Sequence, residues 1–368
     1  MQFRDLQRQY AALKPVLDKE LSEVMSSGLF VMGDKVVALE RQLASYIGTD
    51  YCVSCGSGTD ALYLALRVWN IGPGDAVFVP DFTFFASAEV VSLVGAVPVF
   101  VDVDADTFNM SPIDLQAKID QVRQEGILRP RVVLTVDLFG RPADYGQICP
   151  IAAAEGLWIL EDSAQGFGSA LNGKRTCSFG DIAITSFFPS KPLGCYGDGG
   201  AIYTNNAEWA ALCQSYRQHG KGNDKYDNVR IGINSRLDAL QAAVLLAKLD
   251  IFEQEMHDSQ RIAERYNTVL MDRVGIPSMP KGCVSSWAQY TVRFRSEQER
   301  DECKRRLDRQ GIPAHIYYPT PLHRLPVYRN CQNDEQCPNA VRLSQTVLSL
   351  PMHPYLTDEE IEIITANI

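Results

Sequence analysis

Segments with strand character alternate with segments of helical character between residues 51 and 204, and this alternation restricts the fold more than any other feature. Apolar, β-branched runs such as 97–101 and 132–137 are separated by stretches with apolar residues every three or four positions, such as 111–124 and 145–155. Strands that alternate with helices form a mainly parallel sheet with helices on both faces. The expected fold class is therefore α/β, with ligands at the carboxyl ends of the strands.

The length of the chain predicts more than one domain, because 368 residues exceed the usual size of a single hydrophobic core. A strongly apolar helix at 239–249 is followed by a sharp rise in charge between residues 253 and 265. We expect a large domain at 1–250 and a smaller α+β domain at 251–368. The smaller domain is predicted to contain a strand at 290–294, a helix at 297–310 and a loop at 349–354.

The charge of the chain argues against two classes of partner. A net charge of −10 disfavours binding to nucleic acid or to an anionic membrane surface. No apolar run approaches the roughly 20 residues that span a bilayer, and the first residues lack a signal-peptide pattern. The prediction is a cytoplasmic protein. The ten cysteines are dispersed, and the Cys52–Cys55 pair has no second pair at zinc-site spacing, so no metal is expected.

Lys191 lies in an unusual stretch, Ser-Phe-Phe-Pro-Ser-Lys-Pro-Leu-Gly-Cys-Tyr-Gly-Asp-Gly-Gly, at residues 186–200. Burying an ammonium is costly, so an apolar setting lowers the pKa of a lysine. The neutral amine can attack a carbonyl and form a Schiff base. Glycines let the backbone approach a ligand closely. The same residues also fit a solvent-exposed turn with the lysine at its tip.

A second stretch predicts an anion site. A short strand at 51–55 leads into Gly56-Ser57-Gly58-Thr59-Asp60 and then into a helix. This order places the amides of a helix N-terminus, with the hydroxyls of Ser57 and Thr59, around a phosphate. An ordinary capped helix would have the same pattern.

Together these residues match the needs of a pyridoxal phosphate enzyme. Such an enzyme needs a lysine, an acid beside the pyridine nitrogen, a phosphate-binding turn and an aromatic face for the ring. The chain offers Lys191, Asp162 at the end of a predicted strand, the turn at 56–60, and Phe84. No single residue is specific, but the combination is.

The motifs around these residues resemble those of the DegT/DnrJ/EryC1/StrS family of sugar aminotransferases, over essentially the whole chain. The matching stretches share short, chemically unusual sequences and lie at residues 55–60, 82–84, 161–165, 186–191, 197–200, 217–220, 234–237, 318–319 and 321–323. The resemblance implies fold type I of the pyridoxal phosphate enzymes, with a mainly parallel central sheet and a smaller C-terminal domain.

The resemblance also implies roles for single residues. Lys191 would form the internal aldimine and later move the proton, and Asp162 would pair with the pyridine nitrogen. The other implied cofactor contacts are Gln165 near the ring hydroxyl, Phe84 on the ring, Gly58, Thr59 and Ser186 on the phosphate, and Asn234 from the neighbouring subunit of a homodimer. The implied substrate contacts are Arg236, Tyr317, Tyr318 and His323.

The implied reaction moves an amino group. L-glutamate would convert the cofactor to pyridoxamine phosphate and leave as 2-oxoglutarate, and the amine would pass to a ketone on a nucleotide-linked hexose. The stretches 186–200 and 351–355 look like the branch that aminates C3 of UDP-linked 2-acetamido-3-keto sugars, notably the 3-keto glucuronate used for surface polysaccharides.

The identity of the sugar stays open at this point. A uronate would suit Arg236, because arginine binds carboxylates through paired, charge-assisted hydrogen bonds. Arg236 could instead be a helix-start arginine paired with Asp238 or Asp227. Tyr317 stands where members of this branch often have a histidine, which leaves a neutral UDP-3-keto-N-acetylglucosamine as an alternative. C3 or C4 of a dTDP- or UDP-linked 6-deoxy-keto-hexose is a further one.

Two other classes of protein fit the sequence less well. A nicotinamide-dependent dehydrogenase would need a strand-embedded G-x-G-x-x-G near the start, which the chain lacks. A non-catalytic relative would not need both Lys191 and Asp162.

Overall fold

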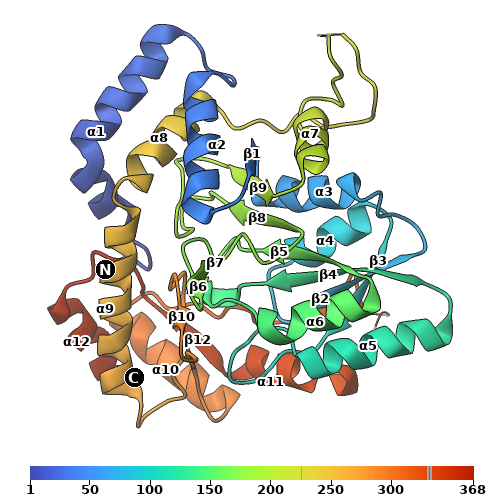
Figure 1. Ribbon diagram of the computed structural model, residues 1–368. Coiled ribbons are helices and arrows are strands. Elements are labelled where there is room, and N and C mark those ends of the chain that lie inside the picture. The colour runs from blue at the N-terminus through green and yellow to red at the C-terminus, as the bar shows by residue number, and fades with distance from the viewer. Residues whose placement is uncertain (225, 330, 332–333) are drawn as a thin grey trace.

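A seven-stranded sheet forms the centre of the protein (Figure 1). The computed structural model describes residues 1–224, 226–329, 331 and 334–368. The strand order is β1-β9-β8-β5-β4-β2-β3, and β9 alone runs antiparallel to its neighbours. The strands are β1 (Tyr51–Cys55), β2 (Asp75–Pro80), β3 (Val97–Val101), β4 (Arg129–Val136), β5 (Trp158–Asp162), β8 (Ile182–Ser186) and β9 (Gly200–Thr204). The expected mainly parallel α/β sheet is confirmed.

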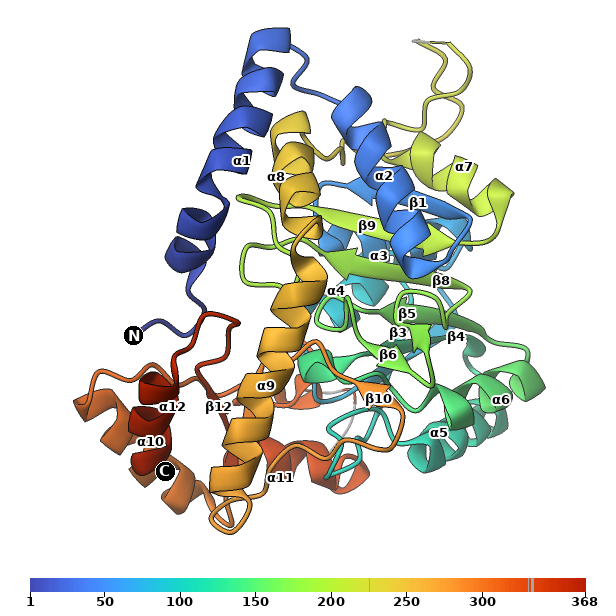
Figure 2. The ribbon, with the colours of Figure 1, turned by 60° about the vertical axis from the view of Figure 1, so that its left-hand side comes forward.

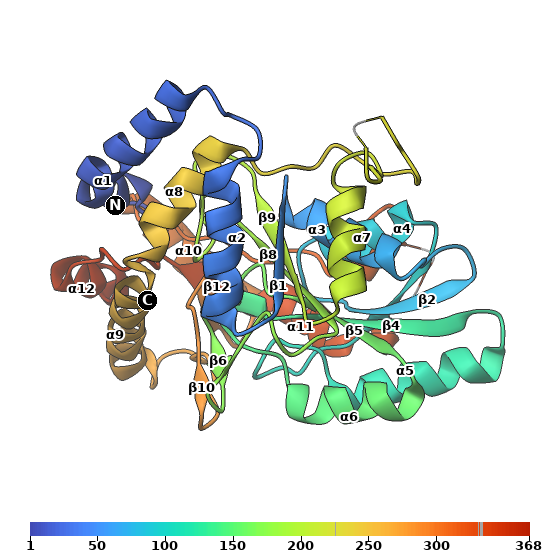
Figure 3. The ribbon, with the colours of Figure 1, turned by 45° about the horizontal axis from the view of Figure 1, so that its top comes forward.

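Helices cover both faces of this sheet (Figures 1 and 3). One face packs against α3 (Gly58–Val68), α4 (Ala86–Leu93) and α7 (Ala207–Tyr216). The other face packs against α2 (Asp34–Ile47) and α8 (Ala239–Leu249) at the β1–β9–β8 side, and against α5 (Pro112–Glu125) and α6 (Tyr145–Glu155) at the opposite side. Short connections such as the hairpin turn at Asn172-Gly173, between β6 (Ala170–Leu171) and β7 (Lys174–Arg175), lie outside these layers.

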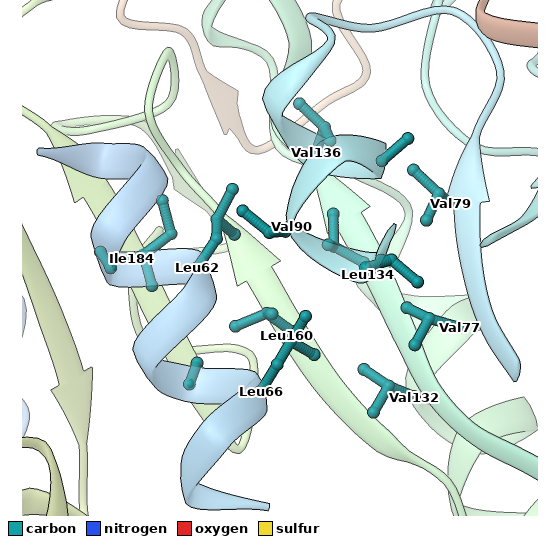
Figure 4. Packing of buried hydrophobic residues seen from close by; sticks show 14 of the residues in the cluster. Leu62, Leu66, Val77, Val79, Val90, Val132, Leu134, Val136, Leu160 and Ile184 are labelled. Carbon is teal, nitrogen blue, oxygen red and sulfur yellow. The ribbon is translucent and has the colours of Figure 1, made fainter. Parts of the chain in front are cut away.

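Strand alternation explains why both layers are apolar. In β2, Val77 and Val79 face one helical layer while Ala76 and Phe78 face the other. Figure 4 shows Leu66 of α3 next to Leu160 of β5, in the same apolar layer as labelled valines and leucines of β2 and β4. Burial of each such side chain contributes about 1.5–3 kcal/mol. The layers therefore hold the strand ends, and the loops that follow them, in fixed positions.

The C-terminal part of the chain builds a second, smaller core (Figure 2). Its strands β11 (Tyr290–Arg293) and β12 (Val347–Leu350) are antiparallel, with Tyr290 opposite Leu350. Helices α9 (Phe252–Leu270), α10 (Glu297–Arg309) and α12 (Asp358–Ala366) pack around them. The expected loop at 349–354 is wrong at its start, because residues 349 and 350 belong to β12. Neither α11 (Pro338–Thr346) nor β10 (Cys283–Val284) was expected.

The connection between α8 and α9 is short, since α8 ends at Leu249 and α9 begins at Phe252. We propose that the boundary between the two domains lies here, near residue 250. Residues from the C-terminal side also join the larger core, among them Leu322, Tyr328 and Leu343.

The N-terminal segment ties the two parts together. Helix α1 (Leu6–Ser27) packs along α8 (Figure 2). Before it, the carbonyl of Phe3 accepts a hydrogen bond from the amide of Met352 at 3.0 Å. Within the described residues, no helix combines the length and apolar character needed to cross a membrane.

Candidate active site

A cavity of about 590 Å³ opens at the carboxyl edge of the sheet. The ends of β4, β5 and β8 and the start of α3 all contribute to its wall. Nine residues that the sequence predicts for the site line it: Gly58, Thr59, Phe84, Asp162, Gln165, Ser186, Lys191, Tyr317 and Tyr318. The volume is within the usual range for small-molecule sites.

The turn between β1 and α3 has the geometry of an anion site. Ser57 caps α3, and its hydroxyl accepts a hydrogen bond from the amide of Asp60 at 3.0 Å. Gly58 begins the helix so close to β8 that a Cβ at this position would lie 2.7 Å from the Cβ of Ser186. Only glycine therefore allows the first amides of α3 and the hydroxyls of Thr59 and Ser186 to converge in the cavity.

Asp162 presents a buried carboxylate to the cavity. Its side chain is 5% exposed and accepts hydrogen bonds from the hydroxyl of Ser87 and the amide of Ala164, both at 3.1 Å. Burial raises the pKa of Asp162, against the effects of Ala164, Lys191 and Ser87. Among the described residues no cation lies within 4.0 Å of this carboxylate. A positively charged ligand group beside Asp162 would offset the free-energy cost of burying its negative charge.

Glu161, the preceding residue, is held in a different way. Because β5 alternates, the side chain of Glu161 points to the opposite face of the sheet from Asp162. Its carboxylate accepts hydrogen bonds from the amides of Cys177 at 2.5 Å, Phe179 at 2.6 Å and Gly180 at 2.9 Å. Glu161 is therefore satisfied within the fold, while Asp162 faces the cavity.

Lys191 extends into the same cavity from the loop that joins β8 to β9. Burial lowers the pKa of its amine, the charge of Arg4 lowers it further, and Asp162 opposes the shift. In the part of the chain that the structure describes, Nζ of Lys191 has no hydrogen-bond partner. An amine without a partner and with a lowered pKa is prepared to act as a nucleophile or a base.

An aromatic wall closes another side. The amide of Gln165 donates a hydrogen bond from Nε2 to the hydroxyl of Tyr318 at 3.0 Å, and its Oε1 accepts one from the amide of Phe139 at 2.7 Å. Burial raises the pKa of Tyr318, so its hydroxyl keeps its proton. The ring of Phe84, 56% exposed, lies with its centroid 6.4 Å from that of Tyr318. These rings offer a flat apolar surface to a ligand.

The sequence did not identify two polar residues of this site. Ser87 reaches Asp162 from α4, three positions after the end of the recognised stretch 82–84. Gln289 lines the cavity from just before β11, and its Oε1 is buried without a hydrogen-bond partner. Nothing in the surrounding sequence marks Gln289, because its position depends on how the C-terminal part packs against the sheet.

Three predicted site residues lie outside this cavity. Asn234 is exposed, and Arg236 lines a separate, open hollow together with Lys221 and Arg230. His323 is 2% exposed, and its Nδ1 lies 2.6 Å from Oδ2 of Asp81. The expected contact of His323 with the substrate does not fit this buried placement. The contacts of Asn234 and Arg236 stay predictions, since they depend on a second subunit.

The pair formed by Asp81 and His323 has a cysteine beside it. The ligand atoms of Asp81, His323 and Cys337 lie within 4.8 Å of one another, and all three side chains are buried. The 2.6 Å separation in the Asp81–His323 pair is that of a hydrogen bond. The expectation of no metal site stays a prediction.

The cavity fits pyridoxal phosphate group by group. The turn at 57–59 suits the phosphate, the buried carboxylate of Asp162 suits a protonated pyridine nitrogen, and the amine of Lys191, with its lowered pKa, suits the aldehyde. The aromatic wall suits the ring.

Comparison with known proteins identifies the family. The profile of the DegT/DnrJ/EryC1/StrS aminotransferase family matches residues 13–368. The UDP-2-acetamido-2-deoxy-3-oxo-D-glucuronate aminotransferase of Pseudomonas aeruginosa is 41% identical, over 100% of this chain and 99% of its own length. The UDP-N-acetyl-3-dehydro-alpha-D-glucosamine 3-aminotransferase of Acidithiobacillus ferrooxidans is 39% identical, over 99% and 96%.

Solved structures agree with this result. A DegT/DnrJ/EryC1/StrS aminotransferase from Brucella abortus has a TM-score of 0.97 and 48% identity, and the match covers 100% of this chain and 98% of that one. A sugar aminotransferase from Streptococcus pneumoniae, solved in its pyridoxamine phosphate form, has a TM-score of 0.90 and 28% identity over 96% and 95%. The expected fold type and cofactor are thereby confirmed. The chain belongs to the DegT/DnrJ/EryC1/StrS family of pyridoxal phosphate-dependent sugar aminotransferases.

Proposed function

We propose that this aminotransferase moves the amino group of L-glutamate to C3 of a UDP-linked 2-acetamido-2-deoxy-3-oxo-glucuronate. Two relatives aligned over nearly their full length act, by their names, on 3-oxo or 3-dehydro UDP sugars. The product would be a building block for surface polysaccharide of the O-antigen type, and the site of the reaction would be the cytoplasm. The observation that carries the proposal is that Lys191 and Asp162 line the same cavity.

Lys191 is the residue that moves the proton. Its amine has a lowered pKa and no hydrogen-bond partner among the described residues, so it can take a proton from a carbon of the bound amino donor and return one to the acceptor. Pyridoxal phosphate, when bound, supplies the electron sink that stabilises negative charge on that carbon. A positioned acid–base group of this kind accelerates a reaction by about 10²–10⁴-fold.

The remaining residues of the cavity bind and orient. Asp162, fixed by Ser87 and Ala164, keeps a proton on the pyridine nitrogen. Gln165 is fixed by Phe139 and directs its Nε2 toward the aromatic wall, close to where the ring hydroxyl would lie. Gly58, Thr59 and Ser186 hold the phosphate, Phe84 stacks on the ring, and Tyr317 and Tyr318 face the sugar.

A homodimer would complete the site. Leu29, Phe30 and Val31 are 62%, 44% and 52% exposed, and Val31 pairs with Asp238 in a β-bridge. This apolar surface therefore lies beside the segment 231–238, where Ile231 is 82% exposed. Contiguous exposed apolar residues indicate an interface with another protein. We propose that a second copy covers this surface and receives Asn234 and Arg236 into its own cavity.

The neutral UDP-3-keto-N-acetylglucosamine is the second candidate substrate. It is favoured by Tyr317, which occupies the cavity where a cationic residue would suit a carboxylate better. The uronate is favoured by the higher identity to the glucuronate enzyme and by Arg236, with Lys221 and Arg230 beside it. A guanidinium binds a carboxylate through two parallel hydrogen bonds.

The test compares the two sugars with glutamate as donor, read by mass spectrometry of the aminated product. We expect faster turnover of the uronate, and we expect Arg236→Ala to remove that preference. Arg305→Ala, an exposed arginine on α10, is the control and should leave both rates unchanged. Equal wild-type rates on both sugars would exclude the carboxylate as the recognised group. Absence of amination of any 3-keto UDP sugar would reject the proposal.

A further inference from the structure

Two cations, one buried and one partly buried, contact the loop that carries Lys191. Lys248 of α8 is 1% exposed, and its Nζ donates a hydrogen bond to the carbonyl of Gly194 at 2.6 Å. The same ammonium lies 4.2 Å from the centre of the Tyr196 ring. Arg4, ahead of α1, donates from Nη2 to the carbonyl of Pro192 at 3.1 Å. Both acceptors lie within three residues of Lys191.

These cations are expensive to bury. Burial lowers the pKa of Lys248 to about 8 and also lowers that of Arg4. Among the described residues neither has a carboxylate within 4.0 Å. The nearest acid that acts on both is Glu255, whose carboxylate already accepts hydrogen bonds from Gln9 and Tyr355. Apolar side chains would pack here at lower cost.

Hydrogen bonds within the loop connect the stretch with the carbonyls of Pro192 and Gly194 to the backbone around Lys191. The amide of Lys191 donates to the carbonyl of Phe188, and the amide of Cys195 donates to the carbonyl of Phe187, both at 2.8 Å. A Cβ on Gly194 would lie 2.5 Å from the carbonyl oxygen of Pro189. Residues on both sides of Lys191 therefore form one compact turn, and a shift of Gly194 would displace Lys191.

We propose that Lys248 and Arg4 are positioning residues, which hold the carbonyls of Gly194 and Pro192 and thereby fix Lys191 in the cavity. Neither touches the cavity, so neither is a catalytic residue. The inference rests on the proposed role of Lys191 and adds to it the groups that keep it in place. It also explains why α8 and the N-terminal segment carry buried charge in an otherwise apolar contact.

Arg4 has a second effect through its charge. It lowers the pKa of Lys191, and Asp162 opposes this on the other side of the amine. Loss of the Arg4 charge should therefore raise the pH at which the amine of Lys191 loses its proton. Lys248 is not among the charges that act on Lys191, so its loss should affect position more than basicity.

The test uses Lys248→Met, Lys248→Arg and Arg4→Met. Lys118→Met is the matched control, because Lys118 is the other buried lysine of the described chain, at 6% exposure, and lies on α5 away from the loop. The first measurement is the rate at which bound pyridoxal phosphate leaves the protein on dilution. The second is the pH dependence with which an amine-reactive reagent modifies Lys191 in cofactor-free protein, followed by mass spectrometry.

We expect Lys248→Met to release the cofactor about 10- to 100-fold faster, the range for losing a hydrogen bond to a charged group. Lys248→Arg should restore part of the retention, and Lys118→Met should have no effect. Arg4→Met should move the midpoint of Lys191 modification to higher pH. If Lys248→Met does not fold, Arg4→Met at the start of the chain tests the same inference.

Wild-type retention and an unchanged midpoint in both Lys248→Met and Arg4→Met would overturn the inference. Failure of the proposed function would look different. In that case borohydride treatment of the wild-type protein with pyridoxal phosphate would not label Lys191.

Discussion

Replacement of Asp162 by asparagine should affect folding and cofactor binding in opposite directions. Asparagine has nearly the same shape, so Ala164 can still donate to Oδ1, and the hydroxyl of Ser87 can rotate to accept from Nδ2. No buried polar atom is left without a partner, and the cost of burying a charge disappears. Cofactor-free Asp162→Asn should therefore be at least as stable as the wild-type protein at pH 7.

The pH dependence of this difference has a definite sign. Burial raises the pKa of Asp162 above its ordinary value of about 4, so the folded protein holds this proton more tightly than the unfolded chain. The wild-type protein accordingly loses stability as the pH rises from about 4 through the raised pKa, and the variant does not. The stability gap between the two proteins should therefore widen over this range, by an amount set by how far the pKa of Asp162 is raised.

In contrast to this effect on stability, Asp162→Asn should bind the cofactor more weakly than the wild-type protein does. A carboxylate beside a protonated ring nitrogen makes a charge-assisted hydrogen bond, and its loss costs about 1.5–3 kcal/mol, or roughly 10- to 100-fold in cofactor affinity. Turnover should fall further, because an amide does not hold the ring nitrogen protonated.

Urea unfolding of cofactor-free protein at several pH values checks the predicted stability. Titration with pyridoxal phosphate checks the predicted loss of cofactor affinity. Asp102→Asn is the control, since Asp102 is a buried carboxylate at the end of β3 outside the cavity, and burial raises its pKa as well. It should change stability and leave cofactor affinity alone. A cofactor-free Asp162→Asn protein that is less stable than wild type by more than 1 kcal/mol, or one with native cofactor affinity, would refute the reasoning.

Two further changes address the phosphate turn and the subunit interface. Gly58→Ala should weaken cofactor binding at least tenfold while β1 and α3 stay folded, because the new Cβ would lie 2.7 Å from that of Ser186. Equilibrium dialysis measures the loss of affinity, and an unchanged affinity for the cofactor would contradict the close fit. Mixed subunits of Lys191→Ala and Asn234→Ala, each inactive alone, should regain part of the activity after subunit exchange, and no regain under conditions where exchange is verified would count against a shared site.

Local patterns in the sequence were sufficient to predict that Asp162 and Lys191 lie close together. Asp162 ends an apolar strand and Lys191 follows another, and adjacent parallel strands bring their carboxyl ends to one edge of a sheet, so their meeting could be predicted. The glycine turn at 56–60 could be read in the same way, because it directly joins a strand to a helix.

Contacts between distant segments could not be read in this way. Ser87 reaches Asp162 across 75 positions, and Gln165 reaches Tyr318 across 153. Nothing in the motif that contains His323 shows that Asp81 holds its ring in a buried position, because that pairing depends on how the C-terminal part packs on the sheet. Short apolar runs are equally ambiguous, which is why the sequence predicts a loop from residue 349 although β12 extends to Leu350.

The contrast between Glu161 and Asp162 has a consequence for protein engineering. The two acids are neighbours in β5, yet three backbone amides donate hydrogen bonds to Glu161, while Asp162 faces the cavity. Insertion or deletion of one residue within β5 would exchange their faces and leave a carboxylate without its amides in the core. Libraries that vary chain length should therefore keep residues 158–162 at constant length and place their insertions in surface turns such as the one at Asn172-Gly173.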